Sequence, residues 1–83
     1  MTQFWILFRS LTHAQRAAGL LERRGITATI TRAPQGLSPK GCGYAVLFRK
    51  RINEALRLLE ENKIPYGQVF ERRESGEFRE ARL

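Results

Sequence analysis

The sequence predicts an α+β fold that uses one strand–helix–strand plan twice. Apolar runs rich in aromatic residues occupy residues 4–8 and 44–48, as expected of buried strands. Apolar residues at the i, i+3, i+4, i+7 spacing of an amphipathic helix follow each run. The triplet Leu-Phe-Arg ends both runs, at residues 7–9 and 47–49. These three observations indicate an internal repeat of about forty residues.

In the first half, residues 4–8 predict a strand and residues 27–31 predict a second strand by their strict alternation. Ser10 or Thr12 can cap the helix between them, and Gly25 can end it. The apolar face of this helix consists of Ala14, Ala17, Ala18 and Leu21.

In the second half, residues 44–48 predict the third strand and residues 66–72 predict the fourth. The helix between them ends before Pro65, and its apolar face consists of Ile52, Ala55, Leu56 and Leu59. Residues 71–83 hold four Arg and four Glu, so their charges cancel, and we expect the tail from Arg73 to fray or to add at most one helical turn.

The order β-α-β-β-α-β favours a ferredoxin-like sandwich, in which two helices cover one face of a four-stranded antiparallel sheet. A chain of 83 residues is long enough for one core. We therefore expect one domain at residues 1–72 and a charged C-terminal tail at residues 73–83.

The charge balance favours anionic partners. The net charge is +7, and residues 1–70 carry all of the excess, with eleven Lys or Arg against four Glu. No apolar run is long enough to span a bilayer and no secretory signal is apparent, so we expect a cytoplasmic protein with no membrane association.

The supply of reactive side chains is small. The chain has one Cys, one His and no Asp. A single Cys excludes an internal disulfide and a multi-cysteine metal site, and a catalytic triad or a zinc centre needs more groups than these. We expect no metal, no cofactor and no autonomous enzyme activity.

The single thiol, Cys42, lies between Gly41 and Gly43. A cysteine tolerated in a loop is one interpretation. The other is an exposed thiol used in chemistry, because flanking glycines let another molecule approach closely. In the predicted topology, the end of the first strand and the loop before the third strand meet at one end of the sheet. Cys42 is then expected near the start of the first helix, close to Thr12 and His13.

That position would favour a thiolate. A helix N-terminus stabilises an anion, and the nearby cations Arg9 and Lys40 act in the same direction. Both effects would lower the pKa of the Cys42 thiol from its ordinary value of about 8.5. Without a second Cys to resolve it, a sulfur adduct on Cys42 has to pass to another molecule, which is how a carrier works. His13 is either a solvated first-turn residue or a hydrogen-bond donor to the sulfur.

The segments Leu11-Thr12-His13-Ala14 and Ser38-Pro39-Lys40-Gly41-Cys42-Gly43-Tyr44-Ala45-Val46 resemble the selenium/sulfur (Se/S) carrier protein-like family. The resemblance covers residues 4–72. It implies that Cys42 is the carrier cysteine, that Gly43 accompanies it, and that Thr12 and His13 belong to the motif at the first helix. It also implies donor and acceptor proteins for sulfur or selenium. The sequence departs from the family in retaining only Ser38 where members often carry several serines.

An RNA-recognition motif and a thiol-bearing interaction adaptor remain alternatives. The RNA-binding signature of the third strand fits at Lys40, Gly41, Gly43 and Tyr44. It fails at Cys42, where a base-stacking ring is required, so nucleic acid is not the expected partner.

We also expect an apolar open face on the sheet, where Trp5 and Leu7 point away from the helices beside Tyr44, Val46 and Phe48. Contiguous exposed apolar surface usually marks a contact, which favours a homodimer formed through this face or a covering partner. The cations Arg49, Lys50 and Arg51 are expected at the opposite end of the sheet from Cys42. They form either a solvated turn or a docking patch for an anionic partner.

Overall fold

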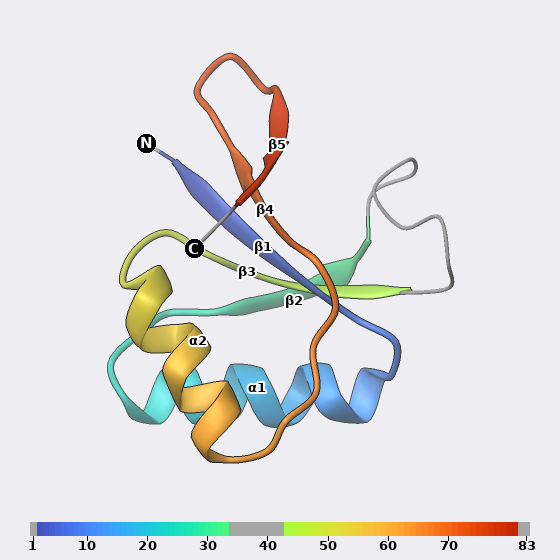
Figure 1. The fold of residues 1–83 in the computed structure, drawn as a ribbon, viewed down its shortest axis with the longest axis vertical. Coiled ribbons are helices and arrows are strands. Elements are labelled where there is room, and N and C mark those ends of the chain that lie inside the picture. Colours follow the sequence, from blue (N-terminus) through green and yellow to red (C-terminus); the bar gives the residue numbers. More distant parts are fainter. Residues whose placement is uncertain (1, 34–42, 82–83) are drawn as a thin grey trace.

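The computed structural model describes residues 2–33 and 43–81. Along the chain the elements are β1(Gln3–Phe8), α1(Leu11–Arg23), β2(Thr29–Arg32), β3(Tyr44–Phe48), α2(Ile52–Glu61), β4(Val69–Arg72) and β5(Phe78–Glu80). The five strands form one antiparallel sheet in the order β2-β3-β1-β4-β5 (Figure 1). The α+β class is confirmed. The predicted count of four strands is wrong, because β5 adds a fifth strand beside β4.

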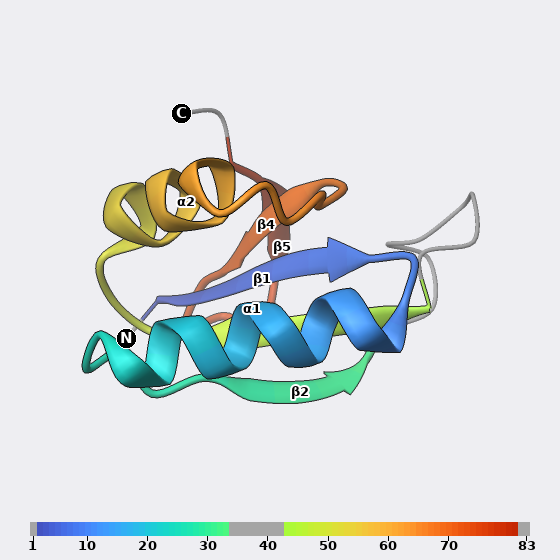
Figure 2. The same cartoon turned by 90° about the horizontal axis from the view of Figure 1, so that it is seen from below.

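Both helices cover the same face of the sheet (Figure 2). The core between the layers joins strand residues such as Ile6, Phe8 and Val46 to the buried side of each helix. The predicted helical faces are confirmed by full or nearly full burial of Ala14, Ala17, Ala18, Leu21, Ala55, Leu56 and Leu59. Ile52 is partly buried against the same core.

The first helix begins and ends as its sequence dictates. Thr12 N–H donates to Ser10 Oγ at 3.1 Å, so Ser10 is the cap and Thr12 is not. At the other end Gly25 has a φ of +81°, and Ile26 N–H donates to Leu21 O at 2.9 Å. This is a glycine C-cap, in which the left-handed residue lets the chain leave the helix.

The face of the sheet away from the helices has a small apolar cluster of its own. Trp5, Leu7 and Ala45 are buried there, with Leu47, Phe70 and Phe78 packed against them. The Trp5 and Phe78 rings meet edge to face, with centroids 5.4 Å apart. Trp5 is only 8% exposed, and its indole Nε1 has no hydrogen-bond partner among the described residues.

The C-terminal segment therefore belongs to the sheet. Phe78 faces Arg72 in the β4–β5 pair, and the Arg72 guanidinium lies 5.4 Å from the centre of the Phe78 ring. The expectation of a fraying tail or a helical turn at residues 73–83 is wrong for residues 78–80, which form β5.

The expected orientation of the third strand is also wrong. Tyr44, Val46 and Phe48 pair with Phe8, Ile6 and Phe4, and all six side chains share the helix-covered face. The Phe4 and Phe48 rings pack with centroids 5.7 Å apart.

The open face consequently exposes less apolar surface than predicted. Within residues 2–33 and 43–81, Leu11 is the one large hydrophobic side chain classed as exposed, at 40%. The described residues do not supply the broad apolar face from which the homodimer was predicted. In the same part of the chain, no helix has the length and apolar character needed to cross a membrane.

Candidate functional site

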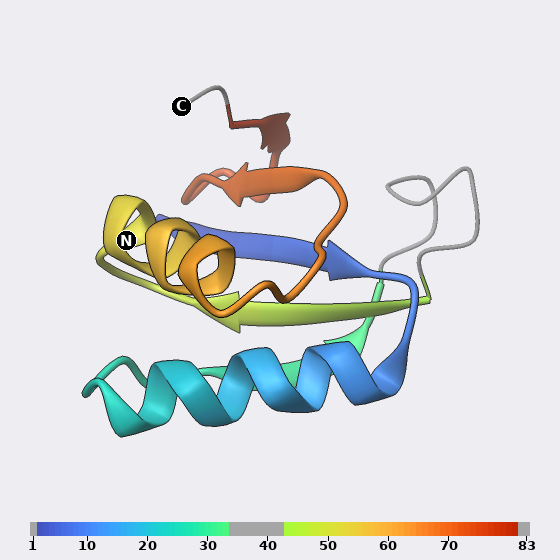
Figure 3. The same ribbon diagram turned by 60° about the horizontal axis from the view of Figure 1, so that its bottom comes forward.

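Three strands position Gly43 at one end of the sheet. Tyr44, the first residue of β3, faces Phe8 at the end of β1 and Arg32 at the end of β2. One residue further out, Ala33 N–H donates to Gly43 O at 3.1 Å. Gly43 therefore lies where β1 and β2 end and β3 begins, at the end from which the chain turns into α1 (Figure 3).

The N-terminus of α1 lies at this end of the sheet. Two residues, Arg9 and Ser10, join β1 to the first residue of the helix, Leu11. Arg9 and Thr12 are exposed and His13 is half-buried. The first turn of α1 has no acidic residue, so no carboxylate in that turn offsets the positive end of the helix dipole.

The connection from α2 to β4 borders the same end. Gly67 N–H donates to Leu7 O at 2.7 Å, and Leu7 N–H donates to Gln68 O at 2.9 Å. These bonds continue the β1–β4 ladder beyond Ile6 and Val69. The end of β1 is therefore held on both sides, which fixes the place where Arg9 leaves the sheet.

The predicted site residues divide into two groups. Arg9, Thr12, His13 and Gly43 all lie at this end of the sheet, as predicted from the topology. Cys42, Gly41 and Lys40 lie outside the described residues. The expected proximity of the Cys42 thiol to Thr12 and His13 therefore stays a prediction.

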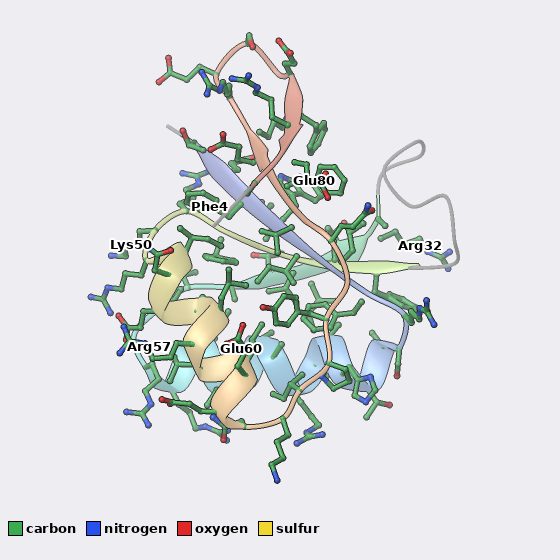
Figure 4. The ribbon with its side chains drawn as sticks, viewed as in Figure 1. Phe4, Arg32, Lys50, Arg57, Glu60 and Glu80 are labelled. Carbon is green, nitrogen blue, oxygen red and sulfur yellow. The ribbon has the colours of Figure 1, made fainter. Side chains whose placement is uncertain are left out.

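Arg32 is a cation at this end of the sheet that sequence reasoning missed. It is exposed, and it faces Tyr44 across the β2–β3 pair. Figure 4 shows it at the opposite side of the molecule from Phe4 and Lys50. The alternating pattern predicted a strand over residues 27–31, one residue short of Arg32, so the position of this side chain could not be read from the sequence.

Two further observations concern the described residues of this region. No group of three or more His, Cys, Asp or Glu side chains there could hold a metal ion. The Tyr44 side chain of the RNA-binding signature faces the helices instead of the open face, where a stacked base would lie.

The cations Arg49, Lys50 and Arg51 follow β3 at the other end of this strand from Gly43, as expected. Arg51 is the N-cap of α2 and has a left-handed backbone, with φ 63°. Its guanidinium donates to Arg24 O at 3.3 Å and so ties the start of α2 to the end of α1.

Comparison with known proteins gives one family. The family model described as Putative Se/S carrier protein-like matches residues 3–71, from the start of β1 into β4. No match was found among curated proteins or among solved structures. Because the match covers most of the 83 residues, this chain belongs to the Se/S carrier protein-like family.

Proposed function

We propose that the chain carries sulfur or selenium on Cys42, as a persulfide or selenopersulfide, between a donor and an acceptor protein. Family membership supports a role in carrying sulfur or selenium and implies contact with proteins that handle these elements. The position of Gly43 supports Cys42 as the attachment point.

One observation carries the proposal. Gly43, the residue bonded to Cys42, lies between the end of β2 and the end of β1. Only two residues separate the end of β1 from the start of α1. Consecutive Cα atoms are about 3.8 Å apart, so Gly43 restricts where Cys42 can be. A thiol attached there would be within reach of the positive end of α1.

The charges at this end of the sheet favour an anionic sulfur. Arg9 and Arg32 are both exposed. Arg9 directly follows β1 and Arg32 is the last residue of β2, and these two strands lie on either side of β3, which begins next to Gly43. Cations and helix N-termini stabilise thiolates and persulfide anions alike. Thr12 N–H already donates to Ser10 Oγ, so in this proposal Thr12 contributes its hydroxyl and His13 an imidazole N–H.

The proposed loading step is an exchange at sulfur. The Cys42 thiolate attacks the outer sulfur of a persulfide on the donor. The donor S–S bond breaks, and its electron pair leaves with the donor cysteine as a thiolate. The outer sulfur and its proton end on Cys42, so the step transfers one sulfur atom without an added oxidant or reductant. The acceptor removes the sulfur by the same exchange in reverse.

We further propose that residues 1–72 form the carrier domain as a ferredoxin-like unit. The order β2-β3-β1-β4 with both helices on one face supports that fold. The family match ends at residue 71, which supports treating β5 as an addition at the edge of this unit.

Intact-protein mass spectrometry tests the carrier proposal. The reduced protein is incubated with a cysteine desulfurase and ³⁴S-labelled cysteine. We expect a gain of one labelled sulfur, its loss on treatment with a thiol, and no gain for Cys42→Ser. An unchanged mass for the wild type, or equal addition to Cys42→Ser, contradicts the proposal.

A further inference from the structure

A hollow of about 640 Å³ opens at the end of the sheet opposite to Gly43. It lies where β1 begins and where β3 leads into α2, beside the start of β2. Its volume is within the range of about 300–1,000 Å³ that is typical of small-molecule sites.

The hollow has an apolar wall that is held in place. Phe4 and Leu47 line it from opposite faces of the sheet, and both are half-buried, so part of each side chain stays accessible. On the open face, Leu47 faces Thr29 across β2 and β3 and packs against the cluster of Trp5, Leu7 and Ala45. This packing gives a ligand on the open face a fixed apolar surface.

Two exposed cations line the same hollow. Arg49 and Lys50 are consecutive, and neither forms an ion pair with an acidic residue of the described chain. They come just before α2, where positive charge is unfavourable because it opposes the helix dipole. The N-cap of α2, Arg51, supplies no side-chain hydrogen bond to the first turn. A bound anion would offset this concentration of positive charge.

Hydroxyl groups complete the lining. Thr2, Thr27 and Thr29 all border the hollow. Each hydroxyl can donate one hydrogen bond and accept others, as ligands with several oxygen atoms require.

We propose that this hollow binds a small organic phosphate that carries a flat apolar ring, of which a nucleoside monophosphate is an example. Arg49 and Lys50 hold the phosphate, because guanidinium and ammonium groups form strong charge-assisted hydrogen bonds to phosphate oxygens. Leu47 contacts the ring on the open face of the sheet, and Thr29, which faces Leu47 across β2 and β3, contacts the remaining oxygen atoms together with Thr27.

This site is separate from the proposed carrier site. Tyr44 and Phe48 mark the two ends of β3, which are about 13 Å apart at the usual rise per residue. The ligand site therefore does not rest on the function proposed for Cys42, and Cys42→Ser is expected to bind the ligand as the wild type does.

Titration of the full-length protein with AMP tests the proposal, with adenosine and inorganic phosphate as the two halves of the ligand. Trp5 is the only tryptophan and faces Leu47 across β1 and β3, so its fluorescence reports occupancy, and calorimetry gives the affinity. We expect AMP to bind at least about tenfold more tightly than adenosine or inorganic phosphate, because only AMP contacts both the two cations and the apolar wall.

Two double variants separate the site from the overall charge. Arg49→Gln with Lys50→Gln is expected to weaken AMP binding by about tenfold or more. Arg16→Gln with Arg57→Gln removes the same charge from exposed helical positions outside the hollow, and is expected to change binding by less than about twofold. Thr27→Val with Thr29→Val keeps the side-chain shape and is expected to weaken AMP binding severalfold, which provides a second test in the hollow.

Three results would overturn the proposal. Equal losses in both charge variants would assign binding to the overall charge. AMP binding no tighter than inorganic phosphate would leave the apolar wall without a role. Much tighter binding of a single-stranded RNA twelve-mer, with the same dependence on Arg49 and Lys50, would assign the surface to nucleic acid.

Discussion

Phe8 and Tyr44 face each other across β1 and β3, and they are the last pair of that ladder before the chain turns into α1. The next residue of β1 is Arg9, and the residue before Tyr44 is Gly43. The same pair therefore sets both the entry to the first helix and the point from which Cys42 extends. A ladder shifted by two residues would separate these two features.

The variant Gly43→Ala tests whether Gly43 serves the approach of a partner to Cys42 or the stability of the fold. A Cβ built on Gly43 meets no atom of the described residues within 4 Å, and the φ of Gly43 is not in the left-handed region. We therefore expect the free energy of unfolding to stay within about 0.5 kcal/mol of the wild type or to rise slightly. Sulfur loading by the desulfurase is expected to slow by roughly tenfold, because a partner thiol has to approach Cys42 closely.

Urea denaturation and the loading assay are compared on the same preparations. A destabilised Gly43→Ala protein would show that this glycine serves the fold. Unchanged loading in a stable variant would show that partners do not need the space that Gly43 leaves.

Ser10→Ala is expected to destabilise the protein. Ser10 Oγ accepts a hydrogen bond from Thr12 N–H at 3.1 Å, and loss of such a cap costs about 1 kcal/mol. Urea denaturation measures the effect, with Ser10→Asp as the control, because a carboxylate can replace the cap. A stability of Ser10→Ala equal to that of the wild type would contradict the assignment of Ser10 as the N-cap.

The two helices end with the same hydrogen-bond pattern, which predicts substitutions of opposite effect. Ile26 N–H donates to Leu21 O and Ile64 N–H donates to Leu59 O, both at 2.9 Å. The left-handed residue is Gly25 after α1 but Lys63 after α2, with φ 56°. We expect Gly25→Ala to lower the free energy of unfolding by about 1 kcal/mol and Lys63→Gly to raise it by up to about 1 kcal/mol.

Thermal and urea denaturation of both variants measure these changes. A loss of stability in Lys63→Gly comparable with that in Gly25→Ala would mean that the left-handed backbone at Lys63 costs nothing.

Tyr66 is expected to ionise at unusually high pH. Burial raises its pKa above the ordinary value of 10.0, and the hydroxyl also donates to Glu60 Oε2 at 2.8 Å. Because the folded state holds the proton more tightly, Tyr66 contributes stability that is fully present below pH 10.0. This contribution is lost as the pH rises through the folded-state pKa.

Tyrosinate absorbance measures this in Tyr44→Phe, which leaves Tyr66 as the only tyrosine. Adding Glu60→Gln removes the negative charge and is expected to lower the midpoint part of the way, since burial remains. An unchanged midpoint would contradict a role for Glu60.

The helix and strand positions were largely predictable because their patterns are local. The helical spacing alone puts Ala14, Ala17, Ala18 and Leu21 on one face of α1, whatever the helix packs against. Gly25 marks the end of that helix because glycine readily adopts the left-handed backbone found there. The strand at residues 44–48 has its predicted bounds. The strand predicted at residues 27–31 is shifted to Thr29–Arg32.

The remaining features depend on contacts between distant residues. Residues 44–48 are apolar at every position, so alternation could not decide which side chains face the helices. The register with Phe4, Ile6 and Phe8 decides it. Segment 73–80 has Phe78 as its one aromatic residue, and that ring pairs with Trp5, more than seventy positions away. Arg32 lies at the same end of the sheet as Gly43 because it pairs with Tyr44. This pairing also joins residues that are distant in the sequence.

The pH dependence of Cys42 alkylation by iodoacetamide tests the central claim most directly, because Cys42 is the only thiol. If the thiol is held at the positive end of α1 beside Arg9 and Arg32, the alkylation rate reaches half its maximum well below pH 8.5, the ordinary midpoint for cysteine. Arg9→Gln with Arg32→Gln then moves the midpoint upward, whereas Arg16→Gln with Arg57→Gln does not. A wild-type midpoint at or above about 8.5, unchanged in both double variants, would contradict the account.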